Sequence, residues 1–167
     1  MNKKTVYICH AALIAALYVV LTYLAEFMGL AKGVIQVRFS EALCILPYFT
    51  PAAIPGVTIG CLIFNLLCGA GPLDIIFGTL ATLLGALGTY ALRRYKWRAS
   101  LPPILSNTII IPLVLHFSGM SEDGIPFMML TVGAGEVISC GILGMMLLFA
   151  VEKYMPSLFF NNEKTTA

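Results

Sequence analysis

The long run of residues 39–92 contains only two formally charged side chains, Glu41 and Asp74. Such a run cannot form the surface of a small water-soluble domain, because a domain of that size exposes much of its chain to solvent. The whole chain of 167 residues is 59% hydrophobic and only 11% charged, whereas a typical soluble domain is about a quarter charged. This composition excludes a soluble enzyme, a disordered chain and a secreted disulfide scaffold. It predicts one polytopic membrane domain that covers residues 1–167.

The apolar segments predict an all-α bundle of six transmembrane helices. A helix needs about 20 apolar residues to cross the hydrocarbon core of a bilayer, and prolines and glycines divide the sequence into pieces. The second and third pieces are short for full crossings, and the second could cross only in part. The expected helices cover about residues 6–27, 40–50, 54–68, 73–92, 101–117 and 125–151.

The basic residues predict how this bundle is oriented. Six crossings place three basic regions on one side, which the positive-inside rule makes cytoplasmic. Both termini are then expected in the cytoplasm, with Lys32 and Arg38 as the exceptions. Five crossings would put the C-terminus outside and weaken this partition only mildly. The residues that share the cytoplasmic side are Lys3, Lys4, Arg93, Arg94, Lys96, Arg98, Lys153 and Lys164.

Polar residues within the apolar segments are the candidate binding residues. Ionisable side chains are costly in a bilayer and usually face the interior of a bundle or a watery cavity. With six crossings most of them lie in the outer half of the membrane, and carboxylates outnumber basic groups. Such a pocket prefers a cation or a ligand with several N–H donors. The candidates are Gln36, Arg38, Glu41, Asn65, Asp74, Asn107 and Glu136.

Most of these candidates also have a purely structural interpretation. Arg38 and Glu41 are three residues apart and could pair with each other. Asp74 could stabilise only the start of a helix, where a carboxylate offsets unpaired N–H groups, and the two asparagines could link helices. Glu136 has the weakest structural explanation, because it lies deep in the last helix. Four aromatic side chains could stack on a flat ring or simply pack: Phe39, Tyr48, Phe64 and Phe77.

Small residues on the first helix could form a docking strip for another protein, although alanine pairs are also common in membrane helices. Alanines four residues apart let a second helix approach closely, and the strip contains Ala11 and Ala15 with a shifted copy at Ala12 and Ala16. No ATP-binding loop, nucleophile–base pair, metal-ligand cluster or cofactor motif occurs. The five cysteines form no C-x-x-C pair and are expected to be buried hydrophobic residues. We therefore expect a non-catalytic, solute-capturing subunit without cofactor or metal.

Several motifs closely resemble those of the QueT family. They are QVRFSEAL at residues 36–43, LPYFTP at 46–51, AIPG at 53–56, Gly60-Cys61 with Asn65, and LDIIFGTLAT at 73–82. The likeness extends over nearly the whole chain and is looser in the last two helices. QueT proteins are substrate-binding S components of energy-coupling factor (ECF) transporters and are implicated in the uptake of queuosine precursors.

The resemblance implies a six-helix bundle that works with a membrane scaffold, the T component, and two ATP-binding cassette ATPases. In this superfamily an alanine strip on the first helix meets the scaffold, which here maps onto Ala11 and Ala15. The implied solute, a 7-deazaguanine, presents a ring N–H and an amine to one carboxylate, for which we expect Glu136 or Asp74. The other candidates would line or seal the pocket. An S component for riboflavin or thiamine, and a membrane scaffold without a solute, are the alternatives.

Overall fold

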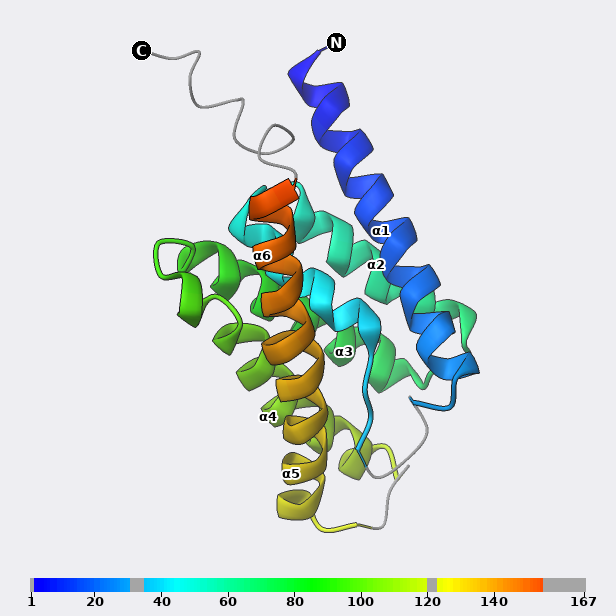
Figure 1. Ribbon diagram of the computed structural model, residues 1–167. Coiled ribbons are helices and arrows are strands. Elements are labelled where there is room, and N and C mark those ends of the chain that lie inside the picture. Colours follow the sequence, from blue (N-terminus) through cyan, green and yellow to red (C-terminus); the bar gives the residue numbers. More distant parts are fainter. Residues whose placement is uncertain (1, 31–34, 120–122, 155–167) are drawn as a thin grey trace.

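The computed structural model describes residues 2–30, 35–119 and 123–154, and this part of the chain contains helices and no strand (Figure 1). The helices pack side by side into one bundle, with the short cyan element η1 running through its middle. In chain order the elements are α1 (Lys3–Phe27), the 3-10 helix η1 (Phe39–Tyr48), α2 (Ala53–Leu67), α3 (Pro72–Ala91), the 3-10 turn η2 (Lys96–Arg98), α4 (Leu101–Phe117), α5 (Ile125–Glu136), the π-helix η3 (Val137–Leu143) and α6 (Gly144–Tyr154).

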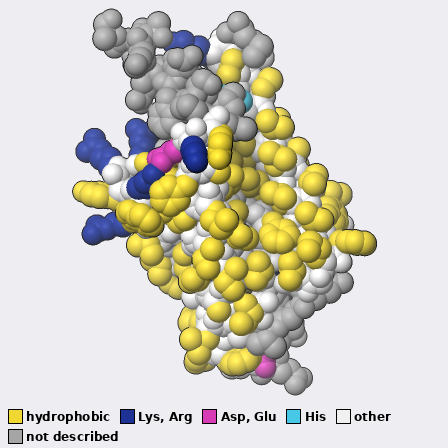
Figure 2. Space-filling model, in the orientation of Figure 1, with side chains coloured by type: hydrophobic (Ala, Val, Ile, Leu, Met, Phe, Trp, Pro, Cys, Tyr) yellow, Lys and Arg dark blue, Asp and Glu magenta, His cyan; other side chains and the backbone are white. Residues whose placement is uncertain are grey.

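Four helical segments are long and apolar enough to cross a membrane. Hydrophobic side chains also cover most of the face seen in Figure 2, as expected for a surface in contact with lipid. Large apolar residues such as Leu130 and Ile8 are 73% and 64% exposed. The protein is therefore a multi-pass membrane protein. The four segments are Lys3–Phe27, Pro72–Ala91, Lys96–Phe117 and Ile125–Tyr154.

The prediction of a six-helix transmembrane bundle, in which the second helix could cross only in part, is supported only as a helical membrane protein with four long apolar segments. The expected helix at 40–50 is a 3-10 helix of 10 residues, about 20 Å long at about 2.0 Å per residue. Helix α2 has 15 residues, or about 22 Å, and both are shorter than a hydrocarbon core of about 30 Å. Pro51 lies in the break between the two helices and lacks the backbone N–H that would continue a helix, while Pro47 lies at the end of η1 and Pro55 in the first turn of α2.

Element η1 lies inside the bundle because most of its residues are apolar. Every residue from Ser40 to Pro47 is buried, as expected for a helix without a broad polar face. Elements α1, α3, α6 and η3 pack around it. The one charged residue of η1, Glu41, is therefore held in the interior, where it is only 3% exposed.

Glycines set the close packing of α1 against α2. A Cβ atom added at Gly60 would lie 2.7 Å from the Cβ of Tyr18 and 2.9 Å from the carbonyl oxygen of Ala15. One at Gly56 would lie 2.9 Å from the Cβ of Ile14. Any larger residue at these positions would push the two helices apart.

The last three elements follow one another as a continuous helical rod (Figure 1). The sequence predicted one helix at 125–151, and the structure extends it to Tyr154. The middle of the rod, η3, is π-helical rather than α-helical. Such insertions in an α-helix are frequent at functional sites.

Basic groups gather at one end of the bundle. The start of α1, the end of α6 and the link that contains η2 lie at this end (Figures 1 and 2). Lys96 of that link forms an ion pair with Glu152 of α6. The arrangement supports the predicted partition of charge, although Lys32 and Lys164 lie outside the described residues.

Candidate binding site

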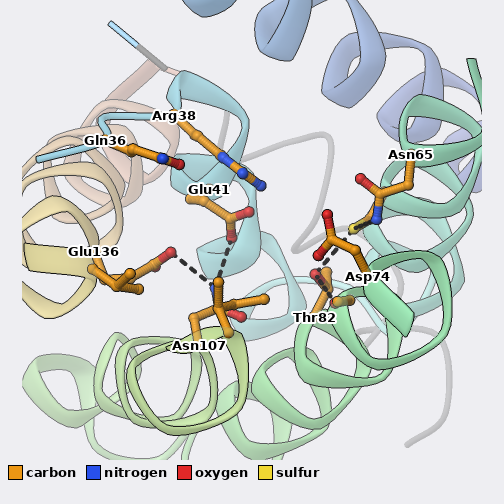
Figure 3. A pocket seen from close by; sticks show the side chains of 12 residues that line it. Gln36, Arg38, Glu41, Asn65, Asp74, Thr82, Asn107 and Glu136 are labelled. Atoms are coloured by element: carbon orange, nitrogen blue, oxygen red, sulfur yellow. Dashed lines mark hydrogen bonds between the residues drawn. The ribbon is translucent and has the colours of Figure 1, made fainter. Parts of the chain in front are cut away.

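One cavity in the bundle is bordered by polar side chains from five segments of the chain (Figure 3). It lies away from the basic end: Asp74 occupies the first turn of α3, and the far end of that helix leads into the basic link. All seven residues that the sequence singled out for binding line this cavity. The lining residues are Gln36, Arg38, Glu41, Cys61, Asn65, Asp74, Gly78, Thr82, Asn107, Ile111, Val132 and Glu136.

The carboxylate of Glu41 is held by donors from three elements. The Tyr18 hydroxyl of α1 donates to Oε1 over 2.6 Å, and the Cys44 thiol donates to Oε2 over 3.2 Å. The Asn107 amide of α4 donates more weakly to Oε2 over 3.4 Å. Glu41 thus ties α1 and α4 to the central element η1. The pairing of Arg38 with Glu41 that the sequence allowed is not formed.

The carboxylate of Glu136 is only half satisfied. Asn107 Nδ2 donates to its Oε1 over 3.0 Å. Its Oε2 atom is buried and has no hydrogen-bond partner among the described residues, and Glu136 is 8% exposed. A buried polar atom without a partner costs about 1–3 kcal/mol. The unused acceptor in the cavity wall is the strongest sign in this structure of a ligand-binding atom.

A second polar group, around Asp74, occupies the other side of the cavity (Figure 3). Thr82 Oγ1 donates to Cys61 Sγ over 3.3 Å, and Asn65 Nδ2 lies 3.6 Å from the same sulfur. A Cβ atom at Gly78 would lie 3.3 Å from Asp74 Oδ1. The glycine therefore leaves room beside the carboxylate. Asp74 also stands in the first turn of α3, where it favours the helix start, so its structural role is compatible with ligand contact.

The cavity contains more negative than positive formal charge. Three carboxylates, from Glu41, Asp74 and Glu136, face one guanidinium, from Arg38. Arg38 forms no ion pair with these carboxylates. If all are ionised, the balance of three negative charges and one positive charge is −2. Buried carboxylates need hydrogen-bond donors or a cation, so the site suits a ligand that brings both.

The open centre of the cavity is small. It measures about 30 Å³, space for about two water molecules. A bicyclic solute would therefore need long lining side chains to move aside. Gln36 and Arg38 can do so, because their side chains form no hydrogen bond with any residue that the structure describes.

Of the two roles that the sequence allowed for the four aromatic side chains, stacking on a solute or packing, packing is the one the structure supports. None of Phe39, Tyr48, Phe64 and Phe77 lines the cavity. Phe64 packs edge-on against Tyr23 with ring centroids 5.1 Å apart, and Phe77 lines an outward apolar groove. Aliphatic Ile111 and Val132 supply the apolar wall instead.

Sequence reasoning missed several members of the site. Asp74, Gly78 and Thr82 are spaced by four residues, as are Cys61 and Asn65, so this periodicity could have found three of them. Tyr18 gives no such signal, because its partner Glu41 lies 23 positions away.

The predicted docking strip divides between two environments. Ala15 is buried at 6% exposure against α2, while Ala12 and Ala16 are exposed. All four alanines, including the half-buried Ala11, line an apolar groove between α1 and α2.

The cysteines were expected to be buried. Cys44, Cys61 and Cys140 are buried, but Cys9 and Cys68 are exposed, so the expectation is wrong for those two. Apolar residues in a membrane helix can face lipid as readily as the core.

Comparison with known proteins assigns this bundle to a family. A family model described as QueT transporter matches residues 8–153. The chain belongs to the QueT transporter family. The queuosine precursor transporter QueT of Lactococcus lactis subsp. cremoris (strain MG1363) is 40% identical over 96 residues, which are 57% of this chain and 56% of that relative. The chain thus matches little more than half the length of this curated relative. No solved structure matches.

Membership of the QueT transporter family confirms the resemblance that the sequence motifs indicated. The chain is thus a helical membrane protein that belongs to a transporter family. A polar cavity inside an apolar bundle is the feature that a transport protein needs to hold its solute.

Proposed function

We propose that this QueT family member is the substrate-binding S component of an ECF transporter and captures a 7-deazaguanine queuosine precursor. The observation that carries the proposal is the buried, unpartnered Oε2 atom of Glu136 in an acidic cavity. The named activity of the Lactococcus lactis relative, transport of a queuosine precursor, supports the same solute class.

Glu136 recognises the guanine-like edge of the solute. This edge offers a ring N–H and an exocyclic amine side by side, which one carboxylate can accept together. Glu136 has a free Oε2 and only one donor on Oε1. Glu41 is the weaker candidate, because three protein donors already occupy its oxygens.

Asp74 faces the other end of the solute. The aminomethyl form of the deazaguanine carries an ammonium group, and a carboxylate on the opposite side of the cavity stabilises it. Asn65 lines the same side (Figure 3), while Gln36 and Arg38 move outward to admit the ring and then seal it.

The subunit crosses the membrane six times, with both termini in the cytoplasm and the cavity in the outer half. The shared basic end of α1, η2 and α6 supports this orientation, since basic residues favour the cytoplasmic side. A T component docks on the groove lined by Ala11, Ala12, Ala15 and Ala16. Two partner ATPases hydrolyse the ATP.

Titration of the purified full chain with 7-aminomethyl-7-deazaguanine, followed by calorimetry, tests the proposal. We expect saturable binding at micromolar ligand or below, unaffected by riboflavin or thiamine as competitors. Displacement of the deazaguanine by riboflavin or thiamine would indicate that the S component binds that vitamin instead. Folded protein that binds none of the three would favour a scaffold without a solute.

A further inference from the structure

The extended segment before η1 is seated on the last helical rod at two points. Arg38 N–H donates to the Ser139 hydroxyl of η3 over 3.0 Å, across 101 positions of sequence. The backbone of Gln36 lies directly against Gly135 of α5, so closely that a Cβ atom at Gly135 would overlap the Gln36 carbonyl oxygen. Neither contact belongs to the cavity wall itself, which Gly135 and Ser139 do not line.

The spacing of the two seats matches the spacing of the segment. Gly135 and Ser139 are four residues apart and so lie on one face of the helical rod, about 6 Å apart along its axis. Gln36 and Arg38 are two residues apart, and two residues of extended chain cover about 6.6 Å. Arg38 has the extended backbone angles φ −115° and ψ 115°. The chain can therefore lie along the rod and touch it at both positions.

This seating directs two side chains to the same place. In extended chain, residues i and i+2 point to one side and the residue between them to the other. Gln36 and Arg38 accordingly line the cavity, and Val37 does not. The Val37 N–H instead donates to the Leu30 carbonyl beyond the end of α1, over 3.0 Å. The segment is thus held from both sides.

The contact at Gly135 depends on the missing side chain. Gly141, on the same rod, provides the contrast: a Cβ atom there would meet its nearest neighbours, Ile104 and Val137, at 3.7 Å, which is ordinary contact. Replacement of Gly135 by alanine must move the Gln36 backbone, whereas the same replacement at Gly141 moves nothing.

We infer that Gly135 and Ser139 are positioning residues for solute recognition: they seat the backbone of residues 36–38 so that Gln36 and Arg38 face the cavity. The consequence for solute affinity rests on the proposed function, but the seating itself does not. Gly135 and Ser139 lie within about one turn of Glu136 on the same rod. That turn therefore carries the proposed solute acceptor and also holds the backbone of residues 36–38.

Hydrogen exchange of the full-length protein, without added solute, tests the seating. Peptides that contain residues 35–38 should exchange faster in Gly135→Ala and in Ser139→Ala than in the unmodified protein, and peptides from α3 should not change. Gly141→Ala is the matched control and should leave both unchanged. Ser139→Ala adds no atoms and removes one hydrogen bond, so it keeps the test decisive if Gly135→Ala does not fold. Unchanged exchange at residues 35–38 in the folded variants would overturn the inference.

Affinity for 7-aminomethyl-7-deazaguanine tests the consequence. Gly135→Ala should weaken binding by about tenfold or more, and Ser139→Ala by several-fold, because the loss of a well-placed hydrogen bond to the solute lowers its affinity by about this factor. The loss from Gly135→Ala should be clearly smaller in a background that carries both Gln36→Ala and Arg38→Ala, since residues that act through one another are not additive. An equal loss in both backgrounds would overturn the inference. If the unmodified protein binds no deazaguanine, the proposed function fails and the exchange measurement alone decides the seating.

Discussion

The side-chain amide of Asn107 on α4 donates to Glu136 on α5 over 3.0 Å. Because the same nitrogen also lies 3.4 Å from Glu41, one neutral group separates two buried carboxylates. It satisfies one oxygen of Glu136 and leaves the other without a partner. The cavity wall therefore contains one Glu136 oxygen that accepts from Asn107 and a second Glu136 oxygen that no described residue uses.

Replacing the unused acceptor should reduce binding without harming the fold. Glu136→Gln keeps the shape of the side chain but removes the charge, and we expect affinity for 7-aminomethyl-7-deazaguanine to fall about 10–100-fold, since a hydrogen bond to a charged group contributes about 1.5–3 kcal/mol. Calorimetric titration measures this. Glu152→Gln at the basic end removes a carboxylate far from the cavity and is the control. An unchanged dissociation constant for Glu136→Gln would exclude Glu136 from the site.

Removing the Tyr18 hydroxyl should harm stability more than binding. Tyr18→Phe removes the hydroxyl that donates to Glu41 Oε1 over 2.6 Å. The buried carboxylate oxygen then has no donor, which lowers the free energy of unfolding by about 1–3 kcal/mol. We expect a lower melting temperature, with a much smaller loss of solute affinity than in Glu136→Gln. Tyr23→Phe, on the same helix, is the matched control, because Tyr23 is exposed. A large loss of affinity with normal stability would instead place Glu41 in contact with the solute.

Asp74 should set the preference for a cationic solute. In Asp74→Asn we expect weaker binding of the aminomethyl deazaguanine and little change for the neutral 7-cyano analogue. Only the aminomethyl compound has an ammonium group, which would lose its interaction with the Asp74 carboxylate. The ratio of the two dissociation constants should change by about tenfold, as expected for one charged hydrogen bond. Equal weakening of both ligands would mean that Asp74 supports the start of α3 and not ligand charge.

The two halves of the alanine strip should respond differently to enlargement. Ala15 is buried against α2, so Ala15→Leu should lower stability by overpacking, about 1–3 kcal/mol. Ala12→Leu and Ala16→Leu change exposed positions and should leave solute binding intact while they weaken assembly with the T component. Co-purification with that scaffold protein measures the assembly. Normal assembly of both exposed variants would show that the scaffold docks elsewhere.

The sequence was sufficient to find seven of the residues that line the cavity, because their signal is local. A carboxylate or amide within an apolar run is costly wherever that run lies in a membrane, so Glu41, Asp74 and Glu136 could be selected without knowing their neighbours. All seven selected residues line one cavity. The helix limits followed as well, since prolines and glycines interrupt the backbone hydrogen bonds of the apolar segments.

Other features depend on contacts between distant parts of the chain, and only the tertiary structure decided them. The sequence did not reveal that Tyr18 donates a hydrogen bond to Glu41, that the Gln36 backbone lies against Gly135, or that none of the four candidate aromatic rings lines the cavity. Each depends on how two helices are rotated against each other, and an almost uniformly apolar helix carries little pattern to show which face is inside. Local polarity thus selected seven residues that line the cavity, and packing between helices decided what each of them touches.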